Sequence, residues 1–165
     1  MRFRSRRVLA GLSLMASLTY GTVQADTQAD VEAIERLYAN WREAVESADI
    51  PSYVAVLDAD VRLLPPGAEA VVGAANYARF LEPVFAAADY RIEVVRSPVV
   101  EVFGDVALAE YEYVIHLALK NPDVGVQQSG ALTAERSAAR YMDVLRRDAD
   151  GQWAVYRHAW HDQPN

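Results

Sequence analysis

The first half of the chain has the apolar spacing of amphipathic helices. After Thr27, which can cap a helix, apolar side chains recur at intervals of three and four residues. These positions are Val31, Ile34, Tyr38, Trp41 and Val45. A second, short helix is predicted over residues 50–57, because Asp49 stands at its capping position and Pro51 suits its first turn. A third helix is predicted after Gly73, with apolar positions at Tyr77, Phe80, Leu81, Val84 and Phe85.

Most of the remaining chain has the alternation of β-strands. Strands are predicted over residues 61–64, 90–94, 99–103, 106–119, 140–147 and 152–160. Gly104 and Asp105 form a two-residue hairpin signal, and residues 121–130 form a polar loop. Helices followed by an antiparallel meander predict an α+β domain, in which a curved antiparallel sheet wraps around three N-terminal helices. Such curvature leaves a cavity between the sheet and the helices.

The N-terminus has the pattern of a secretory signal peptide. Arginines at positions 2, 4, 6 and 7 precede an apolar stretch over residues 8–20, and Val23 and Ala25 suit a cleavage site. The stretch is shorter than the about 20 residues that a membrane-spanning helix needs. We therefore expect a signal peptide over residues 1–25 and one domain over residues 26–165, in a periplasmic or secreted protein without membrane attachment after cleavage. The paired Arg6 and Arg7 leave both the general secretory and the twin-arginine routes open.

The net charge and the cysteine content exclude several classes of partner and of chemistry. The chain has a net charge of -7, and removal of residues 1–25 takes away four arginines and no acid, which lowers the charge to -11. A nucleic acid would meet net repulsion, so no nucleic-acid partner is expected. The chain has no cysteine, which excludes disulfides, thiol nucleophiles and cysteine-ligated metals. Stability must come from the packing of the core.

Several local patterns, taken in order, resemble those of a known superfamily. They are Ile34 to Trp41, Glu43-Ala44, Ala48-Asp49, Val71 to Gly73, Asp150 to Trp153 and Arg157 to Trp160. Together they resemble the nuclear transport factor 2-like superfamily, and in particular its SnoaL-like members, which are related to ketosteroid isomerases. The resemblance covers nearly all of residues 30–163 and implies a cone-shaped fold. It says little about activity, because the superfamily contains isomerases, cyclases, dehydratases and members without known activity.

The resemblance to ketosteroid isomerases is partial at the level of single residues. It places Trp41 where those enzymes have a tyrosine that donates to the substrate oxygen, and Asp143 near an aspartic acid that stabilises the enolate. The general-base aspartate corresponds to the vicinity of Pro65, whose side chain accepts no proton. The resemblance therefore does not imply steroid isomerisation by that mechanism.

Asp143 and His158 are the candidate catalytic residues. Asp143 lies on a predicted strand and faces the same way as Tyr141 and Leu145, so in an apolar cavity it could act as an acid or base. The alternative is an outward carboxylate paired with an arginine. A histidine at position 158 could transfer protons near neutral pH if it faces the cavity, and the alternative is a hydrogen-bonded histidine at the sheet edge.

Aromatic residues are the main candidates for ligand binding. Trp41 and Tyr38 lie on the apolar stripe of the first helix, where packing in the core is the alternative for Trp41. Tyr141 shares the face of Asp143. The resemblance implies that Tyr156, His158 and Trp160 point together into the cavity, although both faces of that strand are mixed.

Glu112 and His116 are a second, conflicting group. The resemblance implies that they face the cavity. Binary patterning favours the reverse, because the aromatic and aliphatic residues of segment 106–119 form the opposite face. A β-bulge would shift the facing by one residue, so both orientations stay open.

No metal site or cofactor is expected. His158 and His161 are three residues apart, which on a strand sends their side chains to opposite faces. Three functions stay open: an exported domain that binds a small hydrophobic or aromatic molecule between Trp41, Tyr141 and Trp160, a cofactor-independent isomerase, lyase or cyclase using Asp143 and His158, and a non-catalytic homodimerisation module.

Overall fold

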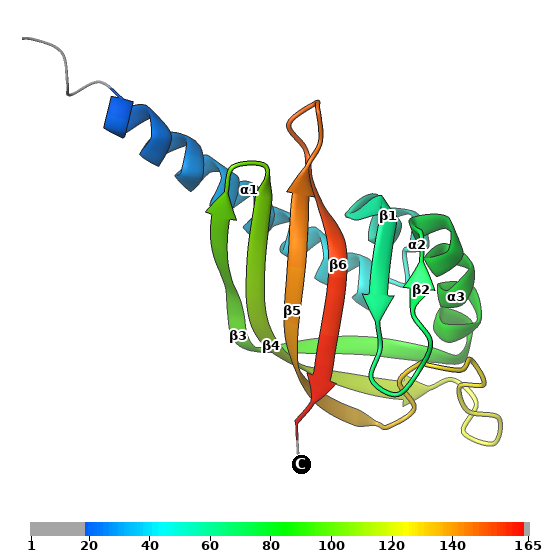
Figure 1. The fold of residues 1–165 in the computed structure, drawn as a ribbon. Coiled ribbons are helices and arrows are strands. Elements are labelled where there is room, and N and C mark those ends of the chain that lie inside the picture. The colour runs from blue at the N-terminus through cyan, green and yellow to red at the C-terminus, as the bar shows by residue number, and fades with distance from the viewer. Residues whose placement is uncertain (1–18, 164–165) are drawn as a thin grey trace, which may run out of the picture.

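A computed structural model describes residues 19–163 as one sheet with three helices (Figure 1). The elements are α1 (Thr19–Glu46), α2 (Ile50–Ala55), β1 (Leu57–Leu64), β2 (Val71–Val72), α3 (Ala74–Ala87), β3 (Ala88–Phe103), β4 (Val106–Leu119), β5 (Arg136–Arg147) and β6 (Trp153–Asp162). The predicted α+β fold with a curved sheet is confirmed. The sheet is open and has six strands in the order β2-β1-β6-β5-β4-β3.

The helices lie where the sequence predicts them, with two differences in extent: α1 begins earlier than predicted, and α2 ends at Ala55 instead of residue 57. Asp49 caps α2 by accepting a hydrogen bond from the backbone N–H of Ser52 at 3.1 Å. Helix α1 begins at Thr19 instead of Thr27, so the predicted cleavage position after Ala25 lies within it. Residues 1–18, most of the predicted signal peptide, lie outside the described residues.

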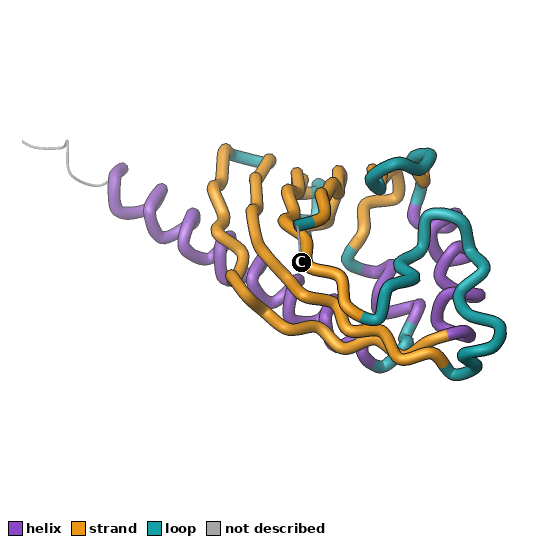
Figure 2. Tube along the Cα trace, turned by 90° about the horizontal axis from the view of Figure 1, so that it is seen from below, coloured by secondary structure: helices purple, strands orange, loops and turns teal. Residues whose placement is uncertain are grey.

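The sheet is strongly bent along its strands, so that its two ends face in different directions (Figure 2). The two segments predicted as separate strands over 90–94 and 99–103 form one strand, β3, whose pairing with β4 shifts between Val94 and Val99. Pro98 lies within this irregular part, and β3 is an edge strand, which tolerates a proline. The bend allows one continuous sheet to face α1 along one half and α3 along the other.

Strand β1 pairs with β6 in parallel, whereas β6, β5, β4 and β3 pair with one another in antiparallel order. The sequence pattern indicated only antiparallel strands. The short strand β2 was not predicted, and it pairs with β1 across the Pro65–Gly67 turn. Because β1 follows α2 directly, the β1–β6 pairing fixes the helices over the concave face of the sheet.

The inner face of β4 is the aromatic and aliphatic one. Tyr111 and Tyr113 are each 1% exposed. On the outer face, Glu112 is bonded to Arg140, with its Oε1 3.1 Å from Nε of the arginine, and His116 is bonded to Glu93 at 2.8 Å. The binary pattern is confirmed, and the expectation that Glu112 and His116 face the cavity is wrong. Charged side chains on this face retain contact with water, whereas the inner face buries the apolar ones.

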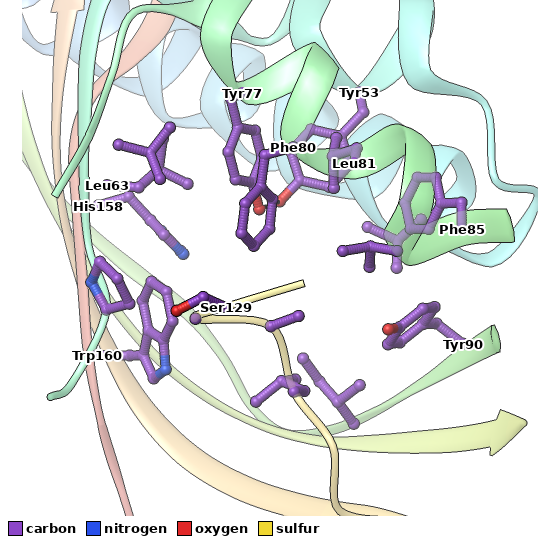
Figure 3. Close-up of a pocket in the computed structure, with 18 of the residues that line it drawn as sticks. Tyr53, Leu63, Tyr77, Phe80, Leu81, Phe85, Tyr90, Ser129, His158 and Trp160 are labelled. Carbon is purple, nitrogen blue, oxygen red and sulfur yellow. Dashed lines mark hydrogen bonds between the residues drawn. The ribbon is translucent and has the colours of Figure 1, made fainter. Parts of the chain in front are cut away.

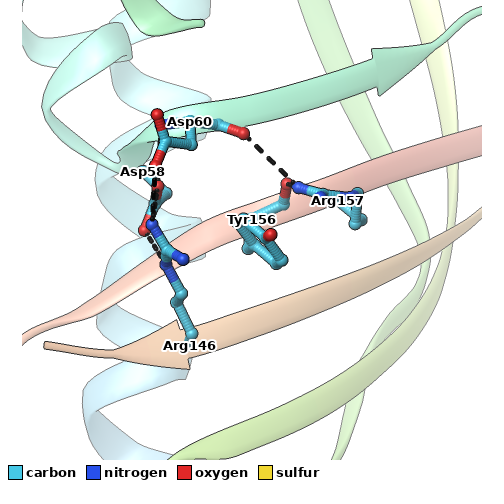
Figure 4. Close-up of polar contacts among 5 residues, drawn as sticks. All are labelled: Asp58, Asp60, Arg146, Tyr156 and Arg157. Atoms are coloured by element: carbon cyan, nitrogen blue, oxygen red, sulfur yellow. Dashed lines mark hydrogen bonds and ion pairs between the residues drawn. The ribbon is translucent and has the colours of Figure 1, made fainter. Parts of the chain in front are cut away.

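A β-bulge in β6 decides which of its side chains face inward. In the pairing with β5, Val144 lies opposite Arg157 while Leu145 lies opposite Val155, so Tyr156 is an extra residue. Its ring lies on the outer face between Arg146 and Arg157, whose guanidinium carbons are 4.2 and 3.5 Å from the ring centroid (Figure 4). The prediction that Tyr156 shares the cavity face with His158 and Trp160 is therefore wrong.

Candidate functional site

A cavity of about 100 Å³ lies between the concave face of the sheet and helices α2 and α3 (Figure 3). Its wall is mainly apolar, and its aromatic residues include Trp41, Tyr53, Tyr77, Phe80, Phe85 and Trp160. Residues 129–132 of the β4–β5 loop and Glu69 of the β1–β2 connection also line it. An apolar cavity of about 150 Å³ holds benzene, so this smaller space limits a ligand to a compact molecule of about one ring at most.

His158 brings a titratable ring to this apolar wall. Its side chain comes from β6 directly after the bulge, and the residue is 9% exposed. The imidazole packs between Tyr141 and Trp160, with ring centroids 5.6 and 5.1 Å away. In Figure 3 the ring projects from the sheet toward the cavity. The bulge therefore places an imidazole ring in an otherwise largely apolar surface.

Asp143 holds this imidazole from behind. Its Oδ1 lies 2.7 Å from Nδ1 of His158, and the aspartate is 1% exposed. The two residues are opposite one another on β5 and β6, so the sheet register itself brings them together. A carboxylate at Nδ1 fixes the proton on that nitrogen and leaves Nε2 free to accept a proton in the cavity.

Two tyrosines complete the hydrogen bonds of the carboxylate. The hydroxyls of Tyr38 and Tyr111 donate to Oδ2 of Asp143 at 2.8 and 2.9 Å. The pKa of both phenols is raised well above the usual value, mainly by burial and secondly by the nearby Asp143. Both tyrosines therefore stay protonated donors at neutral pH. The buried charge of Asp143 is balanced by three donors, which is the condition for keeping a carboxylate in a protein interior.

Asp143 does not line the main cavity. It lies in a small internal space beside Tyr38 and His158, behind the imidazole. The expectation that Asp143 and His158 enter the cavity together as an acid and base pair therefore needs correction. His158 is the residue that a ligand would meet, and Asp143 acts on the position and tautomer of the ring.

Three further tyrosine hydroxyls add polarity to the cavity wall. Those of Tyr53 and Tyr77 lie 3.1 Å apart and share one hydrogen bond. Tyr90, on β3, has a buried hydroxyl for which no partner occurs within the part of the chain that the structure describes. Burial raises the pKa of Tyr77 and of Tyr90 to about 12, so both are neutral donors at physiological pH.

The other predicted ligand-binding residues divide into two groups. Trp41, Tyr141 and Trp160 line the cavity, and Tyr38 lies behind it against Asp143. Glu112, His116 and Tyr156 lie on the outer face of the sheet, for the reasons of strand facing and bulge given above.

Sequence reasoning missed four tyrosines of the site. They are Tyr53, Tyr77, Tyr90 and Tyr111. Tyr77, Tyr90 and Tyr111 all lay on faces predicted to be apolar, where a phenol that needs a hydrogen-bond partner is itself a signal. Tyr53 lay within a predicted helix without any such pattern.

Residues 19–163 contain neither a metal-binding cluster nor a membrane-spanning helix. No group of three or more histidine, aspartate or glutamate side chains is arranged there to hold a metal ion. Within the same range, none of the helices has the length and apolar character needed to cross a bilayer.

The fold and its cavity define an α+β protein of the nuclear transport factor 2-like class. Among solved structures, a nuclear transport factor 2-like superfamily protein from Salmonella enterica serovar Typhimurium superposes with a TM-score of 0.67 at 14% identity, over 84% of this chain and 94% of that one. More specifically, the family model of the SnoaL-like domain matches residues 34–156, and the chain belongs to this family.

Two other similar structures carry functional descriptions. A putative scytalone dehydratase from Novosphingobium aromaticivorans has a TM-score of 0.70 at 12% identity, over 86% of this chain and 89% of that one. A ketosteroid isomerase-like protein from Erwinia carotovora atroseptica has a TM-score of 0.61 at 24% identity, over 81% and 96%. At these identities the similarity shows the shared fold alone. A comparison with curated proteins found no match.

Proposed function

We propose that the protein binds a compact, largely apolar molecule in the cavity and that His158 transfers a proton to or from it without a cofactor. The observation that carries this proposal is the 2.7 Å hydrogen bond between Nδ1 of His158 and the buried carboxylate of Asp143, with the imidazole lining the cavity. A pocket that only binds apolar molecules has no use for a buried charge, which is costly to maintain.

The proposed step begins with neutral His158. Nε2 takes a proton from a carbon next to an electron-withdrawing group of the ligand, so the C–H bond breaks and its electron pair stays on the ligand. The resulting imidazolium keeps its hydrogen bond to the Asp143 carboxylate, which stabilises the positive charge. Return of the proton to another carbon of the ligand completes an isomerisation. In an elimination, the leaving group departs with an electron pair and then receives the proton from His158. Neither outcome needs an oxidant or a reductant.

The apolar surroundings favour this chemistry. His158 is packed by Tyr141 and Trp160, and the cavity is lined mainly by aromatic and aliphatic side chains. Exclusion of water strengthens the interaction between a developing imidazolium and its carboxylate. Two of the structures with a similar fold are described as a putative scytalone dehydratase and a ketosteroid isomerase-like protein.

Exchange of the α-protons of cyclohexanone in D₂O tests the proposal. We expect the wild type to accelerate this exchange, and His158→Gln to slow the catalysed exchange by about 100-fold or more, the usual contribution of a general base. His116→Gln is the matched control, because His116 lies on the outer face of the sheet. Exchange that is equally fast in His158→Gln would exclude His158 as the base. If the wild type binds cyclohexanone without accelerating the exchange, the proton transfer is wrong and only the binding function remains.

We also propose that the protein is exported and that residues 1–25 are removed. The support is the order of arginines, apolar stretch and small residues before Ala25. Expression of the full chain in a Gram-negative host, followed by mass measurement of the periplasmic protein, tests this. A cytoplasmic protein of full mass would contradict it.

A further inference from the structure

The hydroxyl of Tyr90 has no hydrogen-bond partner among residues 19–163. Among the buried side-chain polar atoms of the described residues it alone lacks one. Four other tyrosines of the site have a partner for the hydroxyl: Tyr38 and Tyr111 bond to Asp143, and Tyr53 shares a hydrogen bond with Tyr77. An unpaired buried hydroxyl lowers stability, because it loses its bonds to water and gains none in the protein. A phenylalanine would fill the same space without this cost.

Tyr90 lies at the far side of the cavity from His158. On the sheet, Tyr90 is opposite Leu117 of β4, whereas His158 is linked through Asp143 to Ala109 of the same strand. These β4 positions are eight residues apart. Because the sheet is bent, the side chains of Tyr90 and His158 nevertheless line the same cavity. Figure 3 shows the Tyr90 hydroxyl pointing inward beside Phe85, across the cavity from His158 and Trp160. The Tyr90 and Phe85 rings meet at 5.7 Å, edge to face.

We propose that the Tyr90 hydroxyl is a ligand-binding group that donates a hydrogen bond to an uncharged oxygen of the bound molecule. This inference rests on the proposed function, because it concerns the molecule on which His158 acts. The ligand class is therefore a one-ring compound with a carbonyl, ether or hydroxyl oxygen at the end away from His158. The oxygen supplies the partner that the protein itself does not give to Tyr90.

The lining of the cavity indicates that this oxygen is uncharged. No lysine or arginine is among the residues that line the described cavity, and the carboxylate of Glu69 is part of the lining. A carboxylate or phosphate group placed there would lose its hydration without gaining a cation, and would be repelled by Glu69. A neutral phenol such as Tyr90 is sufficient to bind a neutral carbonyl oxygen and too weak a donor to compensate a buried anion.

Benzaldehyde and styrene test the inference. They have the same shape and differ in one group, because the carbonyl oxygen of benzaldehyde is replaced by a CH₂ group in styrene. Neither has an exchangeable α-proton, so binding is measured without turnover. We expect Tyr90→Phe to weaken benzaldehyde binding about three- to tenfold, the effect of one neutral hydrogen bond, and to leave styrene binding unchanged in protein-observed NMR titrations.

Tyr156→Phe is the matched control, since it makes the same chemical change on the outer face of the sheet. It should alter the binding of neither probe. The ligand-free Tyr90→Phe variant should melt at the same temperature as the wild type or higher, because the change removes an unpaired group. A lower melting temperature would show that the hydroxyl has an internal partner and would overturn the inference.

The remaining outcomes separate this inference from the proposed proton transfer. If Tyr90→Phe weakens neither probe, or both equally, while cyclohexanone exchange still depends on His158, the inference is wrong and the proposed function stands. If Tyr90→Phe discriminates between the probes while exchange is independent of His158, the inference stands and the proton transfer is wrong. A wild type that binds neither probe at millimolar concentration contradicts the inference, and the dependence of cyclohexanone exchange on His158 then decides the proposed function separately.

Discussion

The hydroxyl of Tyr38 in α1 donates a 2.8 Å hydrogen bond to Oδ2 of Asp143 in β5, across 105 positions of the sequence. This bond ties the first helix to the middle of the sheet at the point where the carboxylate also holds His158. The packing of α1 and the orientation of the imidazole therefore depend on one buried carboxylate. Changes at Asp143 should affect stability and the His158 ring together.

Asp143→Asn is expected to lower the free energy of unfolding by about 3 kcal/mol, because three buried donors lose their charged acceptor. Urea unfolding measures this loss. Glu112→Gln is the control: it removes a carboxylate that is bonded to arginine on the outer face, and should cost less than about 1 kcal/mol. Equal losses in the two variants would contradict a special role for the buried carboxylate.

Asp143→Asn should also change the protonation site of His158. In the wild type, NMR of labelled imidazole nitrogens should show the proton on Nδ1, where the carboxylate lies 2.7 Å away. In Asp143→Asn the ring should populate both tautomers, with slower cyclohexanone exchange and little change in cyclohexanone affinity. A fixed Nδ1–H tautomer in the variant would show that Asp143 does not position the proton.

Tyr38→Phe and Tyr111→Phe each remove one donor from the same oxygen of Asp143. Each substitution alone should cost about 1.5 to 3 kcal/mol, the range for hydrogen bonds to a charged group. The double variant should deviate from the sum of the single changes by more than about 0.5 kcal/mol, because the two phenols share an acceptor. Unfolding of all four proteins completes this cycle. Strict additivity would indicate two independent contacts.

Most tyrosines of this protein should resist ionisation while it stays folded. The chain has nine tyrosines. Burial raises the pKa of Tyr38, Tyr53, Tyr77, Tyr90, Tyr111, Tyr113 and Tyr141. Near pH 10, where tyrosines of an unfolded chain titrate, the phenolate absorbance of the native protein should stay well below that of the protein in denaturant.

The raised tyrosine pKa values also set the direction of alkaline destabilisation. The folded state binds these protons more tightly than the unfolded state, so the stabilisation is complete below about pH 10 and is lost as the pH rises through the folded values. For Tyr77 and Tyr90 the folded pKa is about 12. Unfolding free energies measured at increasing alkaline pH should fall. A native absorbance that matched the denatured one near pH 10 would contradict this burial.

Asp58 and Arg146 join β1 to β5 on the outer side of the sheet, where Nη2 of Arg146 lies 2.6 Å from Oδ1 of Asp58 (Figure 4). Burial alone raises the pKa of Asp58, but hydrogen bonds from Arg146 and from the Asp60 backbone, together with the arginine charge, bring it below its usual value. The lowered pKa stabilises the fold above about pH 4, and this contribution disappears as the pH falls through the folded value.

The difference in stability between the wild type and Asp58→Asn should therefore be present at neutral pH and shrink in acid. Urea unfolding at several pH values measures it. Asp60→Asn is the matched control, because its side chain is 81% exposed and lies 3.4 Å from Arg146. A difference that stays constant down to acidic pH would show that the ion pair does not contribute.

Within residues 19–163, some parts of the fold could be predicted from local sequence patterns. The apolar stripe with Tyr38 and Trp41 predicted a helix, and the Gly104-Asp105 pair predicted the turn between β3 and β4. These features depend on neighbours a few positions away, and the period of the side chains reports them directly. The outward facing of Glu112 also followed from such a period, against the expectation from the family resemblance.

The sequence by itself determined the helices, most of the strands, the α+β class and the presence of His158 and Asp143 on neighbouring strands. The tertiary structure decided the parallel pairing of β1 with β6, the bulge at Tyr156 and the meeting of Tyr38 with Asp143. A bulge changes the facing of every later side chain in its strand, and its position depends on the register with a distant strand. For that physical reason, local patterns could not show that His158 lines the cavity with Asp143 behind it, although the family resemblance implied the inward facing of His158.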